Sequence, residues 1–162
     1  MKDFDFDFNS LFKKSLGKPI LYKGQELILA DKIPVNYDEK LRITIESTNS
    51  KYIQGVGISD NIEIFGQKVG KAVVWEYYSV PPENRENTRN QLPYSFEVIC
   101  KNKKGEIFIY NMAEVDGRQD YWNFGCAMIV ENIENGKRYK CNDWQPNEDF
   151  NDIIFRVEKV GI

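Results

Sequence analysis

The sequence predicts an all-β fold: a single-domain antiparallel β-sandwich of jelly-roll type, with at most a short helical turn near the N-terminus. Short runs rich in β-branched and aromatic residues alternate with turn-like breaks, and no long helical period separates them. Aromatic residues make up 14% of the chain, and flat rings pack well on a pleated sheet. The length of 162 residues favours one domain, 1–162, whose core needs no disulfide.

Turn chemistry separates the predicted strands. Asn135-Gly136, within 131–138, is a pair that two-residue type I′ hairpin turns prefer, and 101–106 is expected to be a second hairpin connection. The longest irregular segment, 79–93, is polar and holds three prolines, so we expect a long surface loop. The strands are expected at 25–30, 40–47, 52–58, 62–66, 71–79, 94–101, 106–112, 126–132, 137–141 and 152–160.

Residues 1–24 are predicted to form an N-terminal arm or an edge strand. Phe4, Phe6 and Phe8 alternate with aspartates, which would place three rings on one face of a strand. An ordered strand would bury these rings at the edge of the sandwich, whereas a free arm would dock into a groove of another protein. The segment that follows, 9–18, is compatible with a short helical turn.

Composition argues against several functional classes. The formal net charge of −3, with both signs mixed, disfavours nucleic-acid binding, because nucleic-acid-binding proteins gather Lys and Arg on one face. The chain has no histidine and no catalytic motif, so we expect no enzyme activity. No apolar run is long enough to span a membrane, and the N-terminus lacks the apolar region of an export signal. A cytoplasmic location without membrane partners is therefore expected.

Three cysteines and a tryptophan are expected in the core. Cys100, Cys126 and Cys141 are odd in number and form no C-x-x-C pair, so a disulfide scaffold is not indicated. Scattered thiols of this kind are most often small buried hydrophobic side chains. Trp75 lies within a predicted strand and is also expected to be buried.

The segment 141–152 is rich in oxygen-bearing side chains. Calcium takes about six to eight oxygen ligands, and the candidate ligands here are Asp143, Asp149, Asn151 and Asp152. Their spacing does not follow the EF-hand pattern, so a loop of another design would be required. The same side chains could instead form a polar turn that caps the last strand, or an acidic patch that faces a partner. Strand alternation in the last strand places Ile153, Phe155 and Val157 on the inner face and Asp152 on the outer face.

The stretch NEDFNDIIFRV resembles the pattern D-x-D-F-N-D-h-h-F (h apolar) near the C-terminus of several bacterial β-sandwich families, some implicated in calcium binding or cell-surface adhesion. The last quarter of the chain is also similar to the end of small uncharacterised bacterial proteins that lack export signals. Asp149, Asn151 and Asp152 fall on the pattern. Its first acidic position holds Asn147 or Glu148 instead, and its usual glycine is absent. The resemblance implies a β-sandwich with a calcium site.

Aromatic side chains beside polar ones predict a ligand surface. Tyr121 and Trp122 lie in a predicted loop, and Trp144 lies in the acidic segment. Exposed rings next to carboxylates and amides are typical of sugar sites, because a ring can stack under a pyranose. Together with Asp149 and Asp152, these three residues make up the predicted partner or ligand surface.

These observations predict a non-catalytic protein-binding domain of a bacterial cytoplasmic protein, for example an immunity protein that neutralises a toxin. Clustered carboxylates would then face a basic active site, where complementary charge speeds association. The alternative is a calcium-dependent carbohydrate-binding β-sandwich, in which the acidic segment holds the ion and the rings stack the sugar. Both rest on analogy, because a fold does not imply a function.

Overall fold

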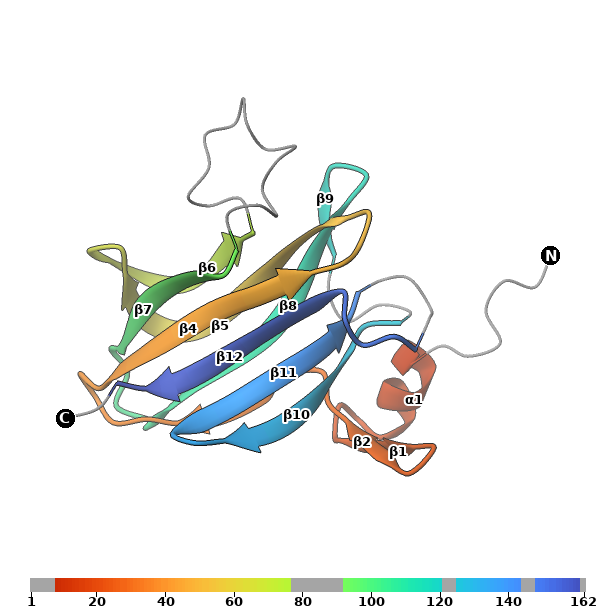
Figure 1. The fold of residues 1–162 in the computed structure, drawn as a ribbon. Coiled ribbons are helices and arrows are strands. Elements are labelled where there is room, and N and C mark those ends of the chain that lie inside the picture. The colour runs from red at the N-terminus through yellow and green to blue at the C-terminus, as the bar shows by residue number, and fades with distance from the viewer. Residues whose placement is uncertain (1–7, 77–91, 121–124, 144–147, 161–162) are drawn as a thin grey trace.

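The computed structural model describes residues 8–76, 92–120, 125–143 and 148–160, and it confirms the all-β prediction (Figure 1). Neighbouring strands pair antiparallel throughout. The elements are α1 (Phe8–Lys14), β1 (Ile20–Tyr22), β2 (Gln25–Leu27), β3 (Asp31–Pro34), β4 (Lys40–Thr48), β5 (Ile53–Ile64), β6 (Gln67–Trp75), β7 (Tyr94–Cys100), β8 (Glu106–Val115), β9 (Arg118–Asp120), β10 (Ala127–Ile133), β11 (Gly136–Asn142) and β12 (Ile153–Lys159).

Ten of these strands form a single sheet that curls over on itself. The hydrogen-bonded order is β10-β11-β12-β4-β7-β5-β8-β3, with β6 paired to β5 and β9 paired to β8. In Figure 1, β10, β11, β12 and β4 lie side by side as one layer, with β5 and β8 behind them. The sandwich is therefore built from two layers of the same sheet.

The sheet changes layer along β5. The first part of this strand pairs with β8, whereas its last residues pair with β7, and the register shifts between Ser59 and Ile62. The predicted hairpin at 101–106 is wrong, because β7 and β8 pair with β5 and not with each other. The side chain of Asn102 fixes this corner: its Nδ2 donates to the carbonyl oxygens of Asp60 (2.6 Å) and Glu106 (2.9 Å).

Inward-facing side chains from both layers form the main core. Ile43 and Ile45 from β4 and Ile107 and Ile109 from β8 are fully buried, as strand alternation requires. Across the layer formed by β11 and β12, the rings of Tyr139 and Phe155 stack with their centroids 4.9 Å apart. The three cysteines are buried and free, as predicted.

A second, smaller core covers one end of the sheet. Helix α1 packs on the hairpin of β1 and β2, and Phe8, Phe12, Leu27, Ala127 and Phe150 are its buried members. The predicted helical turn is confirmed. Phe8 is buried as expected, but as the first residue of this helix rather than within an edge strand. In the part of the chain that the structure describes, no helix has the length and apolar character that crossing a membrane requires.

Two further local predictions are wrong. Ile133 pairs with Gly136, so the hairpin turn between β10 and β11 is Glu134-Asn135, one residue earlier than expected. Asn135 takes a positive φ of 66° in this turn. Trp75 is half-buried rather than in the core, because its neighbour Val74 points inward and strand alternation turns Trp75 outward. The predicted loop 79–93 lies, apart from its last two residues, outside the described residues.

Candidate functional site

The acidic segment closes on itself through hydrogen bonds between the end of β11 and the start of β12. The backbone N–H of Asp143 donates to Oδ2 of Asp152 (2.9 Å), and the N–H of Asp152 donates to the carbonyl of Cys141 (3.0 Å). The N–H of Phe150 donates to Oδ1 of Asn142 (2.7 Å). In these bonds the short side chains of Asn142 and Asp152 take the place of backbone partners at a strand end.

Buried carboxyl groups gather beside this segment. Oδ2 of Asp143 accepts hydrogen bonds from Oγ of Ser50 (2.5 Å) and Nε2 of Gln54 (3.0 Å). Glu76 accepts from the N–H of Gln54 and from Oγ1 of Thr48, both over 2.8 Å. Glu76, Asp143 and Asp152 are all at most 3% exposed. We call Ser50, Gln54, Glu76, Asp143 and Asp152 the buried acid network.

Burial changes the pKa of one carboxyl group in this network, that of Asp152. It raises the pKa of Asp152 to about 7, and the neighbouring carboxylates of Asp143 and Asp149 act in the same direction, while the N–H of Asp143 opposes it. Burial, together with Asp152, also raises the pKa of the Cys141 thiol. That thiol therefore stays protonated and is a poor nucleophile.

The structure brings together some predicted site residues and separates others. Asp143 and Asp152 are neighbours, whereas Asp149 is exposed and Asn151 is half-buried. The expectation that Asp152 lies on the outer face is wrong, because it precedes the first residue of β12, so strand alternation does not apply to it. Tyr121, Trp122 and Trp144 lie outside the described residues.

Calcium binding by the acidic segment stays a prediction. Within the described ranges, no group of three or more His, Cys, Asp or Glu side chains is placed to hold a metal ion. Two amide oxygens, Oε1 of Gln54 and Oδ1 of Asn151, are buried and have no hydrogen-bond partner among the residues that the structure describes. The amide of Gln54 donates to Asp143, and Asn151 directly precedes Asp152 in the chain.

A second site centres on an exposed aromatic ring at a hairpin tip. Ile64 pairs with Gln67, so Phe65-Gly66 is the two-residue turn between β5 and β6, and both turn residues take positive φ (51° and 78°). Turns of this kind prefer Asn or Asp at the first position, because their side chains tolerate positive φ. The phenylalanine found here is 46% exposed.

A cluster of charged and aromatic side chains connects to Phe65 through Glu63, which lines the same groove as Phe65 and pairs with Lys101. Nζ of Lys101 lies 2.5 Å from Oδ1 of Asp38, 3.9 Å from Oε1 of Glu63 and 5.4 Å from the ring centre of Tyr37, which is 49% exposed. We call Tyr37, Asp38, Glu63, Phe65 and Lys101 the Phe65 surface.

A groove of about 300 Å³ lies beside the Phe65 surface, next to β7. The rings of Phe65 and the buried Phe96 are 6.0 Å apart, so they form an apolar wall. Charged side chains of both signs lie around the groove, among them Lys40 and Glu97, whose Nζ and Oε1 atoms are 3.4 Å apart. The groove thus combines an apolar wall with a charged border.

Sequence reasoning missed this second site. Ile62 and Ile64 point into the core, so alternation alone would have turned Glu63 and Phe65 outward. The pair Phe65-Gly66 also ends a predicted strand, but phenylalanine is not a typical turn residue, and the hairpin was overlooked for that reason.

The chain gives no match when it is compared with protein-family models, with curated proteins and with solved structures.

Proposed function

We propose that this chain is a non-catalytic protein-binding domain that contacts its partner through the Phe65 surface. The position of Phe65 is the observation that carries the proposal. A bulky ring at positive φ is strained, and the same ring loses hydrophobic stabilisation when it is nearly half exposed. Residues held in such conformations cluster at binding sites and active sites.

The surroundings of Phe65 match the chemistry of protein interfaces. Aromatic residues are enriched at interfaces, and binding energy concentrates where a side chain fills a pocket inside a polar rim. Tyr37 and Phe65 supply the aromatic area, and the groove beside Phe96 offers room for an anchor side chain. The partner would bring one apolar anchor and a border of charges of both signs, to match Lys40 and Glu97.

Toxin neutralisation is the activity that we propose within this class. An inhibitor works by covering an active site, and it needs a rigid contact surface rather than catalytic groups. Asp38, Glu63 and Glu97 would face basic side chains of the toxin, where complementary charge fixes the register of the complex. The burial of Asp152 supports the Phe65 surface over a contact that uses this carboxyl group.

Calcium-dependent sugar binding is the second candidate. It is favoured by the two unpartnered amide oxygens of Gln54 and Asn151, since amide oxygens are calcium ligands. It is disfavoured by the hydrogen bonds that Oδ2 of Asp143 and Oδ2 of Asp152 already accept, which an ion would have to compete with.

The test of the protein-binding proposal is site-specific photo-crosslinking in cells of the source organism. Benzoylphenylalanine replaces Phe65 in one variant and Phe108 in a matched control. Phe108 is a 37% exposed ring on β8, outside the Phe65 surface. We expect one protein to crosslink at position 65 and not at position 108. Equal crosslinking at both positions would mean that the Phe65 surface is not the interface.

Affinity for the crosslinked protein gives the quantitative check. Loss of an anchor side chain costs about 2 kcal/mol or more, which is roughly a 30-fold weaker Kd. The substitution Phe65→Asn should therefore weaken binding by about that factor, whereas Phe108→Asn should leave it unchanged. Unchanged binding by the Phe65→Asn variant would contradict the proposal.

A further inference from the structure

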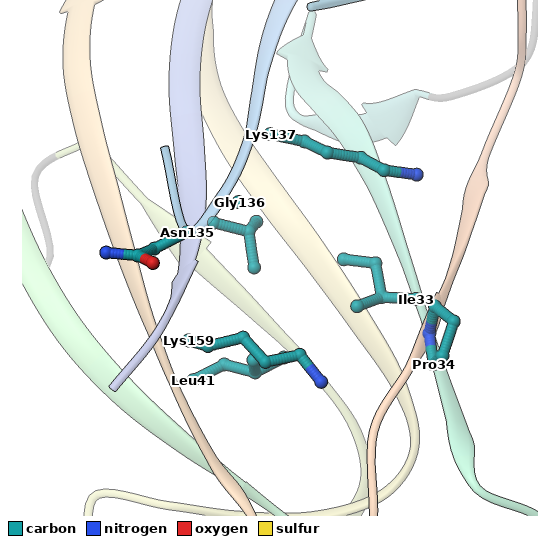
Figure 2. Close-up of a pocket in the computed structure, with 8 residues that line it drawn as sticks. Ile33, Pro34, Leu41, Asn135, Gly136, Lys137 and Lys159 are labelled. Atoms are coloured by element: carbon teal, nitrogen blue, oxygen red, sulfur yellow. The ribbon is translucent and has the colours of Figure 1, made fainter. Parts of the chain in front are cut away.

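A separate cavity opens at the end of the curled sheet, between β3 on one side and β11 and β12 on the other (Figure 2). Its volume is about 400 Å³, within the range of small-molecule sites. We call it the mouth pocket. Its lining residues are Ile33, Pro34, Leu41, Asn135, Gly136, Lys137, Val157 and Lys159.

The mouth pocket exists because the curled sheet does not close fully. In the described chain, β3 and β10 stand at the two ends of the hydrogen-bonded strand order, and no ladder of hydrogen bonds joins them. Two contacts bridge this seam. Ile28 and Met128 exchange backbone hydrogen bonds, and Oδ2 of Asp31 accepts from the hydroxyl of Tyr139 (2.6 Å) and from Nζ of Lys137 (3.1 Å). Past Asp31, the seam opens into the cavity.

The floor of the mouth pocket is aliphatic. Ile33, Leu41 and Val157 come from three different strands and are 7%, 1% and 3% exposed, so they belong to the main core while facing the cavity. No aromatic ring lines the cavity among the described residues. A floor of branched aliphatic side chains suits a flexible hydrocarbon chain better than a flat ring, which would need a flat partner to stack on.

The rim of the mouth pocket is cationic, although the chain as a whole is acidic. Lys137 and Lys159 are the only charged side chains that line it in the described chain, and Figure 2 shows them bordering the cavity from two sides. Their carboxylate partners, Asp31 at 3.1 Å and Glu39 at 3.3 Å, do not line the pocket. The charged side chains that line the pocket are therefore both cationic, and each is paired with a carboxylate that lies outside the lining.

Both lysines can accept a new partner at low cost. The side chains of Lys137 and Lys159 are 36% and 49% exposed, and ion pairs at such exposure contribute little to stability. Each ammonium group also carries more than one N–H donor, so it can bind a ligand without releasing its carboxylate.

We propose that the mouth pocket binds a fatty carboxylate, with its aliphatic chain on Ile33, Leu41 and Val157 and its carboxylate on the lysine rim, at Lys159. This site is independent of the Phe65 surface, since the two share no residue. The proposal therefore adds a ligand to the protein-binding function and does not rest on it.

Calorimetric titration of the purified chain with sodium decanoate, below its critical micelle concentration, tests the proposal. We expect saturable binding of one decanoate, and an affinity that falls about fourfold for each methylene removed from the ligand chain. Decylamine, which has a similar chain and the opposite charge, should bind at least about tenfold more weakly. No saturable binding of decanoate, or equal binding of decanoate and decylamine, would overturn the proposal.

Three variants locate the site. Lys159→Gln should weaken decanoate binding about tenfold through the loss of a charged hydrogen bond. Lys40→Gln is the matched control: this lysine has a similar exposure of 45% and a similar ion pair, 3.4 Å from Glu97, but it does not line the pocket. Pro34→Trp should block the opening without touching the core, since Pro34 is exposed. If Lys159→Gln and Pro34→Trp bind decanoate with the affinity of the parent chain, as the control Lys40→Gln should, decanoate binds elsewhere and the assignment is contradicted.

Discussion

The backbone N–H of Asp143 donates to Oδ2 of Asp152 over 2.9 Å, so two carboxyl groups that are at most 3% exposed lie side by side at the end of β11. The neighbouring ionisable groups that raise the pKa of Asp152 are the carboxyl groups of Asp143 and Asp149. Two buried neighbouring carboxylates repel each other when both are ionised. This pair therefore makes the stability of the fold depend on pH.

The first prediction concerns pH and the substitution Asp152→Asn. The pKa of Asp152 is about 7 in the folded chain and 3.8 as the reference for the unfolded chain. Between these values the folded state holds a proton that the unfolded state has lost, so this carboxyl stabilises the fold most below pH 3.8, and that contribution falls until pH passes about 7. The amide introduced by the substitution cannot ionise. We expect the Asp152→Asn variant to gain stability relative to the parent as pH rises through this window.

Urea unfolding of both proteins at several pH values between about 4 and 8 measures this difference. The two free energies of unfolding should converge, or change order, as pH rises. If the difference between the two free energies of unfolding stays constant across this pH window, Asp152 does not titrate there.

The second prediction concerns the donor from Ser50. Ser50→Ala removes the 2.5 Å hydrogen bond to Asp143 and leaves a buried carboxylate with one donor fewer. We expect a loss of about 1–3 kcal/mol in the free energy of unfolding. Ser95→Ala is the control, because the hydroxyl of Ser95 also bonds a side chain, Thr44 at 2.8 Å, but lies at the surface where water can replace it. Similar losses of unfolding free energy in both variants would mean that the burial of Asp143 does not increase the cost of removing its hydrogen-bond donor.

The third prediction links the strain at Phe65 to function. Phe65→Asn creates an Asn-Gly turn, which suits two positive φ values, so we expect the fold to become more stable by about 0.5–1 kcal/mol. Asp116-Gly117 is a matched turn between β8 and β9, with positive φ at both positions. Asp116→Phe should therefore lower stability by a similar amount. Chemical denaturation of both variants checks this. A loss of stability in Phe65→Asn would mean that the ring is a structural element of the turn.

The fourth prediction concerns Gly136, where β11 begins. A Cβ at this position would collide with the carbonyl oxygen of Val157 on β12, so Gly136→Ala must displace one strand from the other. We expect destabilisation of about 1–3 kcal/mol. At Gly70 an added Cβ meets nothing within 4 Å, so Gly70→Ala should change stability by less than about 0.5 kcal/mol. Thermal melts of the two variants should separate clearly, and equal melting temperatures would contradict the close approach.

The fifth prediction tests the calcium hypothesis for Asp143, Asp149, Asn151 and Asp152. An ion present at about a hundred times its Kd adds about 2.7 kcal/mol to the free energy of unfolding. In a chain of this size that raises the Tm by roughly 5–10 °C. A calcium site thus predicts a higher Tm in millimolar calcium than in EDTA. Equal melting temperatures would contradict the calcium hypothesis and mean that these side chains form hydrogen bonds only.

Most of the correct predictions about the fold followed from strand alternation. It identified the stretches that form β4, β7, β8, β11 and β12, and it turned Ile153, Phe155 and Val157 inward, as found. It failed for Asp152, which lies just outside β12, because alternation holds only while the backbone is extended. A bend of one residue was enough to turn a predicted surface acid into a buried one.

The site was harder to predict than the fold. Asp143 and Asp152 could be recognised as neighbours because the segment between them is short. Ser50 and Gln54, which donate to Asp143, come from a distant part of the chain, and nothing in their local sequence marks them as partners. Phe65 was missed because its turn carries an unusual residue, and the mouth pocket was missed because its walls come from four strands.

The sequence by itself determined the β class, the burial of the cysteines and the short helix, because these follow from residue type and local periodicity. Only the tertiary structure decided that β7 and β8 both pair with β5, that Asp152 is buried beside Asp143, and that a seam between β3 and β10 leaves Lys137 and Lys159 around an aliphatic cavity. The physical reason is that strand pairing joins residues far apart in the chain. The energy of strand pairing depends on which strand edges meet, and the local sequence pattern does not specify that pairing.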